Sequence, residues 1–134
     1  MPADTIVYCL TRDRDLATGI DERLADALAF FYNDAARLQQ AVVLRRPDIV
    51  VVDTGAIRRE YGDAGLGPVV EFLRERASSA RIGVRPGPGA DWLVGAEAGQ
   101  GVEMLPPDTA ACVEAVDRLC AEVDQKRRIR SGGQ

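Results

Sequence analysis

Short apolar segments alternate with amphipathic segments along the whole chain. The apolar segments are rich in β-branched or aromatic residues and are bounded by polar or turn-forming residues, a pattern that predicts buried strands. There are five of them: Thr5–Leu10, Leu28–Tyr32, Ile49–Val52, Arg81–Val84 and Val102–Leu105. In the segments between and after them, apolar residues recur at helical intervals. These segments predict helices around Leu16–Leu24, Ala35–Val42, Leu66–Leu73, Asp91–Gly99 and Cys112–Val123.

Two connections in this pattern lack helical periodicity. Thr54–Gly65 is predicted to be a long polar loop, and Arg85–Gly89 (Arg-Pro-Gly-Pro-Gly) a stiff turn. The second segment is glycine-rich and follows a strand, as phosphate-binding loops do. It matches none of their spacings, however, and its two prolines remove backbone N–H donors that a phosphate would need.

The order of these elements predicts the fold class. A helix separates each pair of consecutive strands, as the crossovers between parallel strands require. We therefore expect an α/β protein: a three-layer αβα sandwich around one five-stranded parallel sheet. In such folds functional residues gather beyond the carboxyl ends of the strands. Here those ends are Leu10–Thr11, Asp53–Thr54, Val84–Arg85 and Leu105–Pro106.

Composition removes several classes of function. The 134 residues suffice for one domain, and they include no histidine. Ser-His-Asp catalysis, Cys-His catalysis and histidine-containing metal sites are therefore excluded. A net charge of -4, a pI of about 4.9 and only 5 % aromatic residues argue against a nucleic-acid-binding module. We expect no metal and no cofactor.

The cysteines and the amino terminus bear on location. Cys9, Cys112 and Cys120 form neither a CxxC motif nor a disulfide framework, which favours a reducing, cytoplasmic setting. All three read as buried core residues. We predict no signal peptide, because the first residues lack a charged segment followed by an apolar run. We predict no membrane span, because no apolar run is long enough to cross a bilayer.

Charge is unevenly distributed along the chain. Residues 125–134 hold four basic residues and no acidic one, so the rest of the chain carries a charge of -8. We divide the chain into a domain over residues 1–124 and a basic C-terminal tail or linker over 125–134. Two interpretations of the tail stay open: a contact site for anionic partners, or a solvated helix end, where cations are favourable.

One strand that ends in an aspartate and two short motifs further along carry a family resemblance: Arg46–Asp53, Glu97–Gly99 and Leu105–Pro107. Together they resemble the receiver domain of bacterial response regulators over residues 4–123. Arg46–Asp53 (RPDIVVVD) is similar to the third strand of that family, which ends in the phosphoacceptor aspartate. Glu97-Ala98-Gly99 matches the end of the family's fourth helix, and Leu105-Pro106-Pro107 takes the place of its apolar-Lys-Pro motif. The resemblance implies a flavodoxin-like topology with strand order 2-1-3-4-5, and Asp53 as the phosphoacceptor equivalent.

The departures from the family concern its phosphorylation site. The two acidic positions after the first strand, which help to bind Mg²⁺, fall on Cys9 and Leu10. The hydroxyl position at the end of the fourth strand falls on Val84, and the lysine position on Pro106. Mg²⁺ takes oxygen ligands, which these side chains do not offer. Asp13 and Asp15 lie a few residues after the two acidic positions of the family, and one of them could turn back towards the site as a Mg²⁺ ligand.

The resemblance therefore implies an atypical, or pseudo-, receiver: a scaffold for protein–protein contact in signal transduction, without catalysis. Asp53 is then vestigial, and it can equally serve as a carboxylate that ends a strand and caps the next turn. One alternative is a working receiver that is phosphorylated on Asp53. Another is a flavodoxin-like domain that binds a small ligand at the turns after the first, third and fourth strands.

Partner contacts are expected on the face made by the fourth helix, the fifth strand and the last helix. The resemblance implies that this face joins two copies or meets a protein partner. Candidate interface residues are Trp92, Glu103, Arg118 and Glu122. Trp92 can instead pack on the body of the domain. The last helix either continues past Val123 towards a further segment or ends there in solvent.

Overall fold

A computed structural model describes residues 5–24, 27–61, 66–86 and 102–132. Its strands form one parallel sheet in the order β2-β1-β3-β4-β5, as the sequence predicts. The strands are β1 (Thr5–Leu10), β2 (Ala27–Tyr32), β3 (Ile49–Asp53), β4 (Arg81–Arg85) and β5 (Val102–Met104). The helices are α1 (Arg14–Arg23), α2 (Ala35–Leu44), α3 (Thr54–Tyr61), α4 (Leu66–Arg76) and α6 (Thr109–Gly132).

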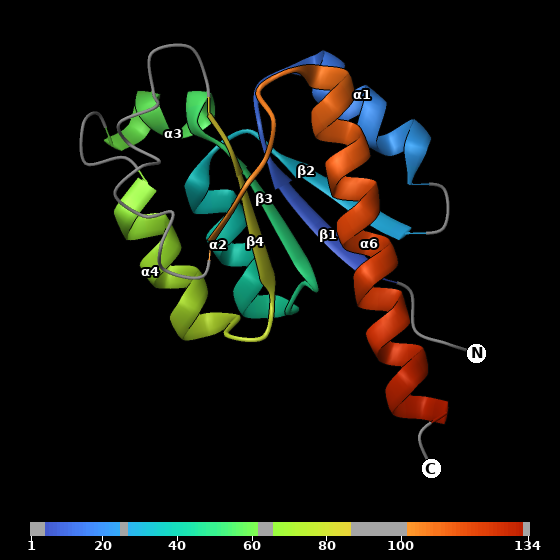
Figure 1. The fold of residues 1–134 in the computed structure, drawn as a ribbon. Helices are drawn as coiled ribbons and strands as arrows, with labels where there is room; N and C mark the ends of the chain where they lie inside the picture. Colours follow the sequence, from blue (N-terminus) through green and yellow to red (C-terminus); the bar gives the residue numbers. More distant parts are fainter. Residues whose placement is uncertain (1–4, 25–26, 62–65, 87–101, 133–134) are drawn as a thin grey trace.

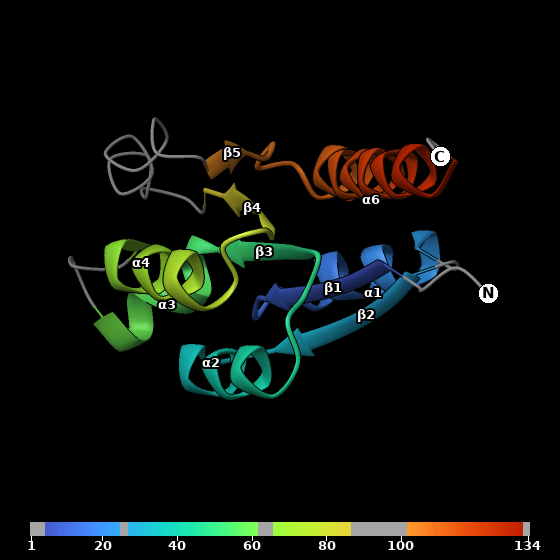
Figure 2. The same cartoon turned by 90° about the horizontal axis from the view of Figure 1, so that it is seen from below.

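The helices cover both faces of the sheet, which gives the predicted three layers. Figure 2 shows α1 and α6 on one face, and α2, α3 and α4 on the other. The central strands β1 and β3 are buried along their whole length, since both of their faces are covered.

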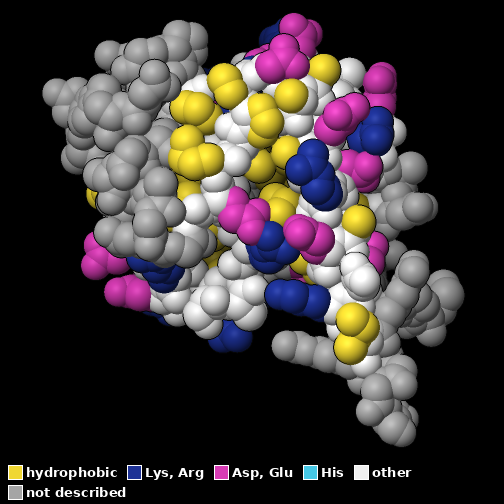
Figure 3. Space-filling model, viewed as in Figure 1, with side chains coloured by type: hydrophobic (Ala, Val, Ile, Leu, Met, Phe, Trp, Pro, Cys, Tyr) yellow, Lys and Arg dark blue, Asp and Glu magenta, His cyan; other side chains and the backbone are white. Residues whose placement is uncertain are grey.

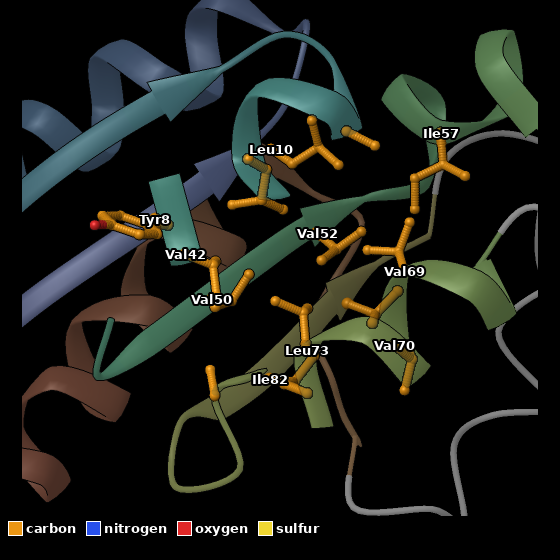
Figure 4. Close-up of a cluster of buried hydrophobic side chains, with 14 of the residues drawn as sticks. Tyr8, Leu10, Val42, Val50, Val52, Ile57, Val69, Val70, Leu73 and Ile82 are labelled. Carbon is orange, nitrogen blue, oxygen red and sulfur yellow. The ribbon is translucent and has the colours of Figure 1, made fainter. Parts of the chain in front are cut away.

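Two hydrophobic clusters hold the layers together, one on each face. Alternate side chains of a strand point to opposite faces, so β1 and β3 contribute to both clusters. One cluster joins the sheet to α2, α3 and α4, and Figure 4 shows its members Tyr8, Leu10, Val50, Val52 and Leu73. The other joins the sheet to α1 and α6 and includes Cys9, Val51, Cys112 and Cys120.

The prediction of a polar loop over residues 54–65 is wrong for its first part. Thr54–Tyr61 forms α3, which packs Ala56 and Ile57 into the core. The carboxylate of Asp53 accepts a hydrogen bond from Gly55 N at 3.2 Å and so caps this helix. One cap and two adjacent apolar residues are enough to form a short helix here, but they give no repeating pattern that periodicity could detect.

The last helix is longer than its apolar pattern. α6 runs without a break to Gly132, and Figure 1 shows it continuing past the lower end of the sheet. The helix predicted at Asp91–Gly99 lies outside the described residues. No helix in the described part of the chain is both long and apolar enough to cross a membrane.

Candidate functional site

Asp53 lies at the carboxyl end of the central strand β3, where the fold predicts a site. Its side chain is 9 % exposed. Besides capping α3, the carboxylate accepts a hydrogen bond from the hydroxyl of Thr11 at 2.8 Å, and Thr11 directly follows β1. The ends of the two central strands are therefore linked through this one buried carboxylate.

Arg85, the last residue of β4, lies beside Asp53 on the neighbouring strand and is paired with it in register. One guanidinium nitrogen of Arg85, Nη1, lies 2.8 Å from Asp13 Oδ2 and 3.4 Å from Asp53 Oδ2. The Arg85 side chain is only 12 % exposed. A buried cation thus bridges the two carboxylates at this edge of the sheet.

The other nitrogens of Arg85 reach the beginning of α6. Nε donates to the carbonyl of Pro107 at 3.0 Å, and Nη2 donates to the hydroxyl of Thr109 at 3.1 Å. The planar guanidinium can serve several acceptors at once, since its N–H groups point in fixed, different directions. Arg85 therefore ties β4 to the end of β3 and to the segments that follow β1 and β5; we call this group of contacts the Arg85 cluster.

Asp13 has a second role, because it caps α1. Its Oδ1 accepts from Asp15 N at 3.0 Å and from Leu16 N at 3.3 Å, while Oδ2 pairs with Arg85. The hydrogen bond from Arg85 lowers the pKa of Asp13, and the two backbone hydrogen bonds add to this effect. Burial lowers the pKa of Arg85, but the hydrogen bond to Asp13 and the charges of Asp53 and Asp13 outweigh it and raise that pKa, so the pair is charged at neutral pH.

The four positions that the sequence assigned to a degenerate pocket do not form one group of neighbours. Leu10 and Val84 lie in the hydrophobic cluster on the α2–α4 face, and Cys9 lies in the cluster on the α1–α6 face. Pro106 is half-buried in the connection between β5 and α6. The polar groups of the site come instead from nearby positions, among them Thr11 and Arg85.

These residues do not fit a Mg²⁺ site. Mg²⁺ requires several oxygen ligands in near-octahedral geometry. Among the described residues, the carboxylates of Asp13 and Asp53 are both paired with Arg85, whose positive charge would repel a divalent cation. Asp13 does lie near Asp53, as the sequence allowed, but as a partner of Arg85 and a helix cap.

The thiols below the cluster are not activated. Cys9 and Cys112 are fully buried, and burial raises the pKa of both; for Cys112 it reaches about 11. A thiol with a raised pKa is a poor nucleophile at neutral pH, because the thiolate is the reactive form. The prediction that Cys9, Cys112 and Cys120 are core residues is confirmed.

Two of the predicted interface residues, Glu103 and Glu122, form ion pairs with the same arginine. Arg81, at the start of β4, forms ion pairs with Glu103 of β5 and with Glu122 of α6. These residues border a groove of about 500 Å³ beside α6. Arg118 is exposed, and Trp92 lies outside the described residues. Figure 3 shows acidic and basic side chains next to one another on this face.

Sequence analysis named Arg85 at a strand end where functional residues gather, but gave it no role of its own. It stands in the string Arg-Pro-Gly-Pro-Gly, whose prolines and glycines indicate a turn and conceal the last residue of the strand. The available signal was the fold itself. Residues at the carboxyl ends of adjacent parallel strands are neighbours, so an arginine there lies within reach of Asp53.

Known structures share this fold at low sequence identity. A signal receiver domain from Vibrio parahaemolyticus superimposes with a TM-score of 0.72 at 11 % identity, over 95 % of this chain and 98 % of that one. The signal receiver domain of an HD domain-containing protein from Pseudomonas fluorescens Pf-5 gives 0.70 at 12 %, over 96 % and 95 %. A de novo designed Rossmann 2x3 protein gives 0.66 at 14 %, over 90 % and 91 %.

The likeness is therefore one of fold. The chain has the flavodoxin-like topology of response regulator receiver domains, but a designed protein has a similar arrangement. No protein-family model and no curated protein matches the sequence. What the domain does has to be argued from its own residues.

Proposed function

We propose that this chain is a receiver-like signalling domain that acts by protein–protein contact in the cytoplasm and does not take up phosphate with Mg²⁺. The observation that carries the proposal is the position of Arg85 between Asp13 and Asp53. Together with the receiver topology, it indicates a scaffold that keeps the shape of a receiver and replaces its metal-dependent chemistry with a fixed internal ion pair.

The physical argument concerns the nucleophile. Transfer of a phosphoryl group to Asp53 needs a carboxylate oxygen with an accessible lone pair and a cation free to neutralise the transferred group. Both oxygens of Asp53 are already hydrogen-bonded, Oδ1 to Gly55 N and Oδ2 to Thr11 and Arg85. Arg85 is positive but is held by four acceptors. The carboxylate is therefore better suited to a structural role than to nucleophilic attack.

Signalling output would then use surfaces of the domain. The face of β5 and α6, with Glu103, Arg118 and Glu122, remains our candidate for a protein partner, and Trp92 belongs to the same prediction. Residues 125–134 remain proposed as a basic C-terminal tail or linker; α6 runs into this segment as one helix through residue 132.

Binding of Mg²⁺ with a phosphoryl mimic tests the proposal. We expect the melting temperature of the protein to be unchanged by Mg²⁺ and beryllofluoride together, and mass spectrometry after incubation with acetyl phosphate and Mg²⁺ to find no phosphoryl adduct. The Asp53→Asn variant is the control for nonspecific effects. Stabilisation or an adduct that depends on both Mg²⁺ and Asp53 would establish a working receiver instead.

Native mass spectrometry of the purified protein tests the small-ligand alternative. The turns after the first, third and fourth strands, where a ligand was expected, supply Asp13, Asp53 and Arg85, which already satisfy one another. We therefore expect the mass of the protein alone. A retained small molecule that is lost on unfolding would favour a ligand-binding domain.

A further inference from the structure

The end of α6 is attached to the domain differently from the rest of the helix. As far as Val123, apolar side chains of α6 pack against the sheet in the hydrophobic cluster shared with α1, and Cys120 is the last of them that is buried. Residues 124–132 add no side chain to this cluster, and none of their described side chains is buried. We call residues 124–132 the C-terminal arm. Among the described residues, the contacts that attach the arm to the sheet are polar.

Two residues of the arm contact two residues at the amino ends of the strands; we call these four the Asp48 cluster. Arg127 Nη2 lies 2.8 Å from Asp48 Oδ1, and Arg127 Nη1 donates to the hydroxyl of Thr5 at 3.5 Å. The same hydroxyl donates to the carboxylate of Asp124. These contacts lie at the lower end of the sheet in Figure 1, where α6 continues past it.

Asp48 is held in place by the sheet, independently of Arg127. Its backbone N donates to the carbonyl of Ile6 at 2.9 Å, and its own carbonyl accepts from Arg81 N at 2.9 Å. Its carboxylate oxygen Oδ2 also accepts from Ile6 N at 2.8 Å. Asp48 is thus bound to β1 and β4 through groups that do not involve α6. If the contact between Asp48 and Arg127 breaks, it is therefore the arm that moves.

The exposure of this ion pair makes it separable. The side chains of Arg127 and Asp48 are 30 % and 29 % exposed, whereas those of Arg85 and Asp53 are only 12 % and 9 % exposed. Water can hydrate both partly exposed charges after they separate, so breaking this pair leaves no charge buried and unpaired. Dissolved salt also screens partly exposed charges more strongly than buried ones. A short helix end without apolar packing is only marginally stable, because most helical stability in proteins comes from packing.

We propose that the C-terminal arm alternates between a docked and a released state, controlled by the ion pair of Arg127 with Asp48, while α6 stays packed up to Val123. In the docked state Asp48 binds the guanidinium of Arg127. In the released state that guanidinium is available to an anionic group elsewhere. The proportion of the two states therefore depends on ionic strength. The inference does not rest on the proposed function, which concerns Asp53.

Amide hydrogen exchange of the unaltered protein, followed by NMR at about 0.05 M and about 1 M NaCl, tests the two states without any substitution. The reporters are the amides of Arg128 and Ile129 in the arm. Their exchange rates are divided by that of the Leu119 amide, in the packed part of α6, to remove effects common to the whole helix. Because the higher salt concentration weakens the ion pair, we expect both arm amides to exchange faster and this ratio to rise at least about fivefold.

Two variants assign the salt effect to Arg127. In Arg127→Ala the arm amides should exchange fast already at the lower salt concentration, and the ratio should differ by less than about twofold between the two salt concentrations. Lys126→Ala is the matched control, because it removes the same charge from the neighbouring position. Lys126 is exposed and is in none of the ion pairs among the described residues, so this variant should keep the salt dependence of the unaltered protein. Circular dichroism confirms that both variants are folded.

Three results would overturn the proposal. The first is an equal exchange ratio at both salt concentrations in the unaltered protein. The second is a salt dependence that Lys126→Ala abolishes as fully as Arg127→Ala does, which would indicate a general effect of charge. The third is exchange of the Leu119 amide that accelerates with salt as much as that of the arm, because α6 would then open as one unit.

Discussion

The Arg85 side chain shows how one residue can set the character of a site. Its guanidinium serves Asp13, Asp53, the carbonyl of Pro107 and the hydroxyl of Thr109. Buried charges are tolerated when they are paired and hydrogen-bonded, and they are costly when a partner is removed. The consequence is a site whose acidic residues are neutralised from within the protein.

Replacement of Arg85 by alanine should therefore destabilise the fold. The change leaves the buried carboxylate of Asp53 without its cation, and we expect a loss of about 2–4 kcal/mol in the free energy of unfolding. Urea denaturation followed by circular dichroism measures this loss. Arg81→Ala is the matched control: it removes an ion-paired arginine from the other, more exposed end of β4, and should cost no more than about 1 kcal/mol. Equal losses of unfolding free energy in the two variants would show that the Arg85 cluster stabilises the fold no more than the ion pairs of Arg81 do.

The pH dependence of the free energy of unfolding should show the stabilising contribution of the ionised Asp13 carboxylate. Its pKa is lowered in the folded protein by the hydrogen bond from Arg85. A carboxyl group with a lowered folded pKa stabilises the protein above its unfolded pKa, about 3.9. This contribution disappears as the pH falls through the lower, folded value. The stability difference between the unaltered protein and Asp13→Asn should thus be constant from about pH 5 to 7 and shrink below about pH 4. A difference that grows on acidification would contradict the assignment.

At the scale of elements, the strands were more predictable than the connections. All five strands were found within one residue of their predicted ends, because each is a short run bounded by polar or turn-forming residues, and the central strands β1 and β3 are also buried and rich in β-branched residues. α3 was missed because its formation depends on the cap by Asp53 and the packing of Ile57. The cap is a local signal, which the sequence analysis interpreted as the cap of a turn, whereas the packing of Ile57 exists only once the sheet has formed.

The C-terminal part of α6 contacts the sheet through a basic residue. Arg127, in the basic segment, lies 2.8 Å from a carboxylate oxygen of Asp48, the residue before β3. The other oxygen of Asp48 accepts a hydrogen bond from Ile6 N at 2.8 Å. At least this part of the basic segment therefore contacts the sheet, at the edge opposite to the Arg85 cluster.

Substitutions at this contact should separate the contribution of the Arg127–Asp48 ion pair from that of the hydrogen bond between Ile6 N and Asp48. Arg127→Ala removes a partly exposed ion pair and should cost about 0.5–1 kcal/mol. Asp48→Ala also leaves the Ile6 amide without its acceptor and should cost about 1–3 kcal/mol more. Thermal or urea unfolding of both variants provides the measurement, and Arg37→Ala, which removes an exposed ion pair on α2, is the control. A smaller loss for Asp48→Ala than for Arg127→Ala would refute this account of the contact.

At the scale of the whole molecule, the sequence predicted the architecture but not the internal cation. The layers and the strand order follow from the alternation of strands and helices and from the receiver resemblance. The pairing of Arg85 with Asp53 depends on the register of β3 against β4, which arises only from the assembled sheet. The sequence thus located Asp53 and the end of the sheet where it lies. Its pairing with Arg85, which comes from the neighbouring strand β4, was not predicted.

The Arg85 cluster also makes a prediction about how distant parts of the molecule move together. It joins the start of α1, through Asp13, to the start of α6, through Thr109. Ala17 and Cys112 carry first-turn amides of these helices that donate to the backbone carbonyls of the capping residues; in Arg85→Ala, their exchange should accelerate together by about tenfold or more.

The corresponding amide of α2, that of Leu38, is the internal control. It donates to Asp34 in the same first-turn position, but α2 makes no contact with Arg85 among the interactions of the described residues. Hydrogen exchange followed by NMR measures all three amides in one sample. Loss of global stability alone would accelerate globally exchanging amides by a common factor, whereas release of the cluster accelerates Ala17 and Cys112 above Leu38. Selective acceleration at only one of the two helices would mean that Arg85 supports each helix separately and does not couple them.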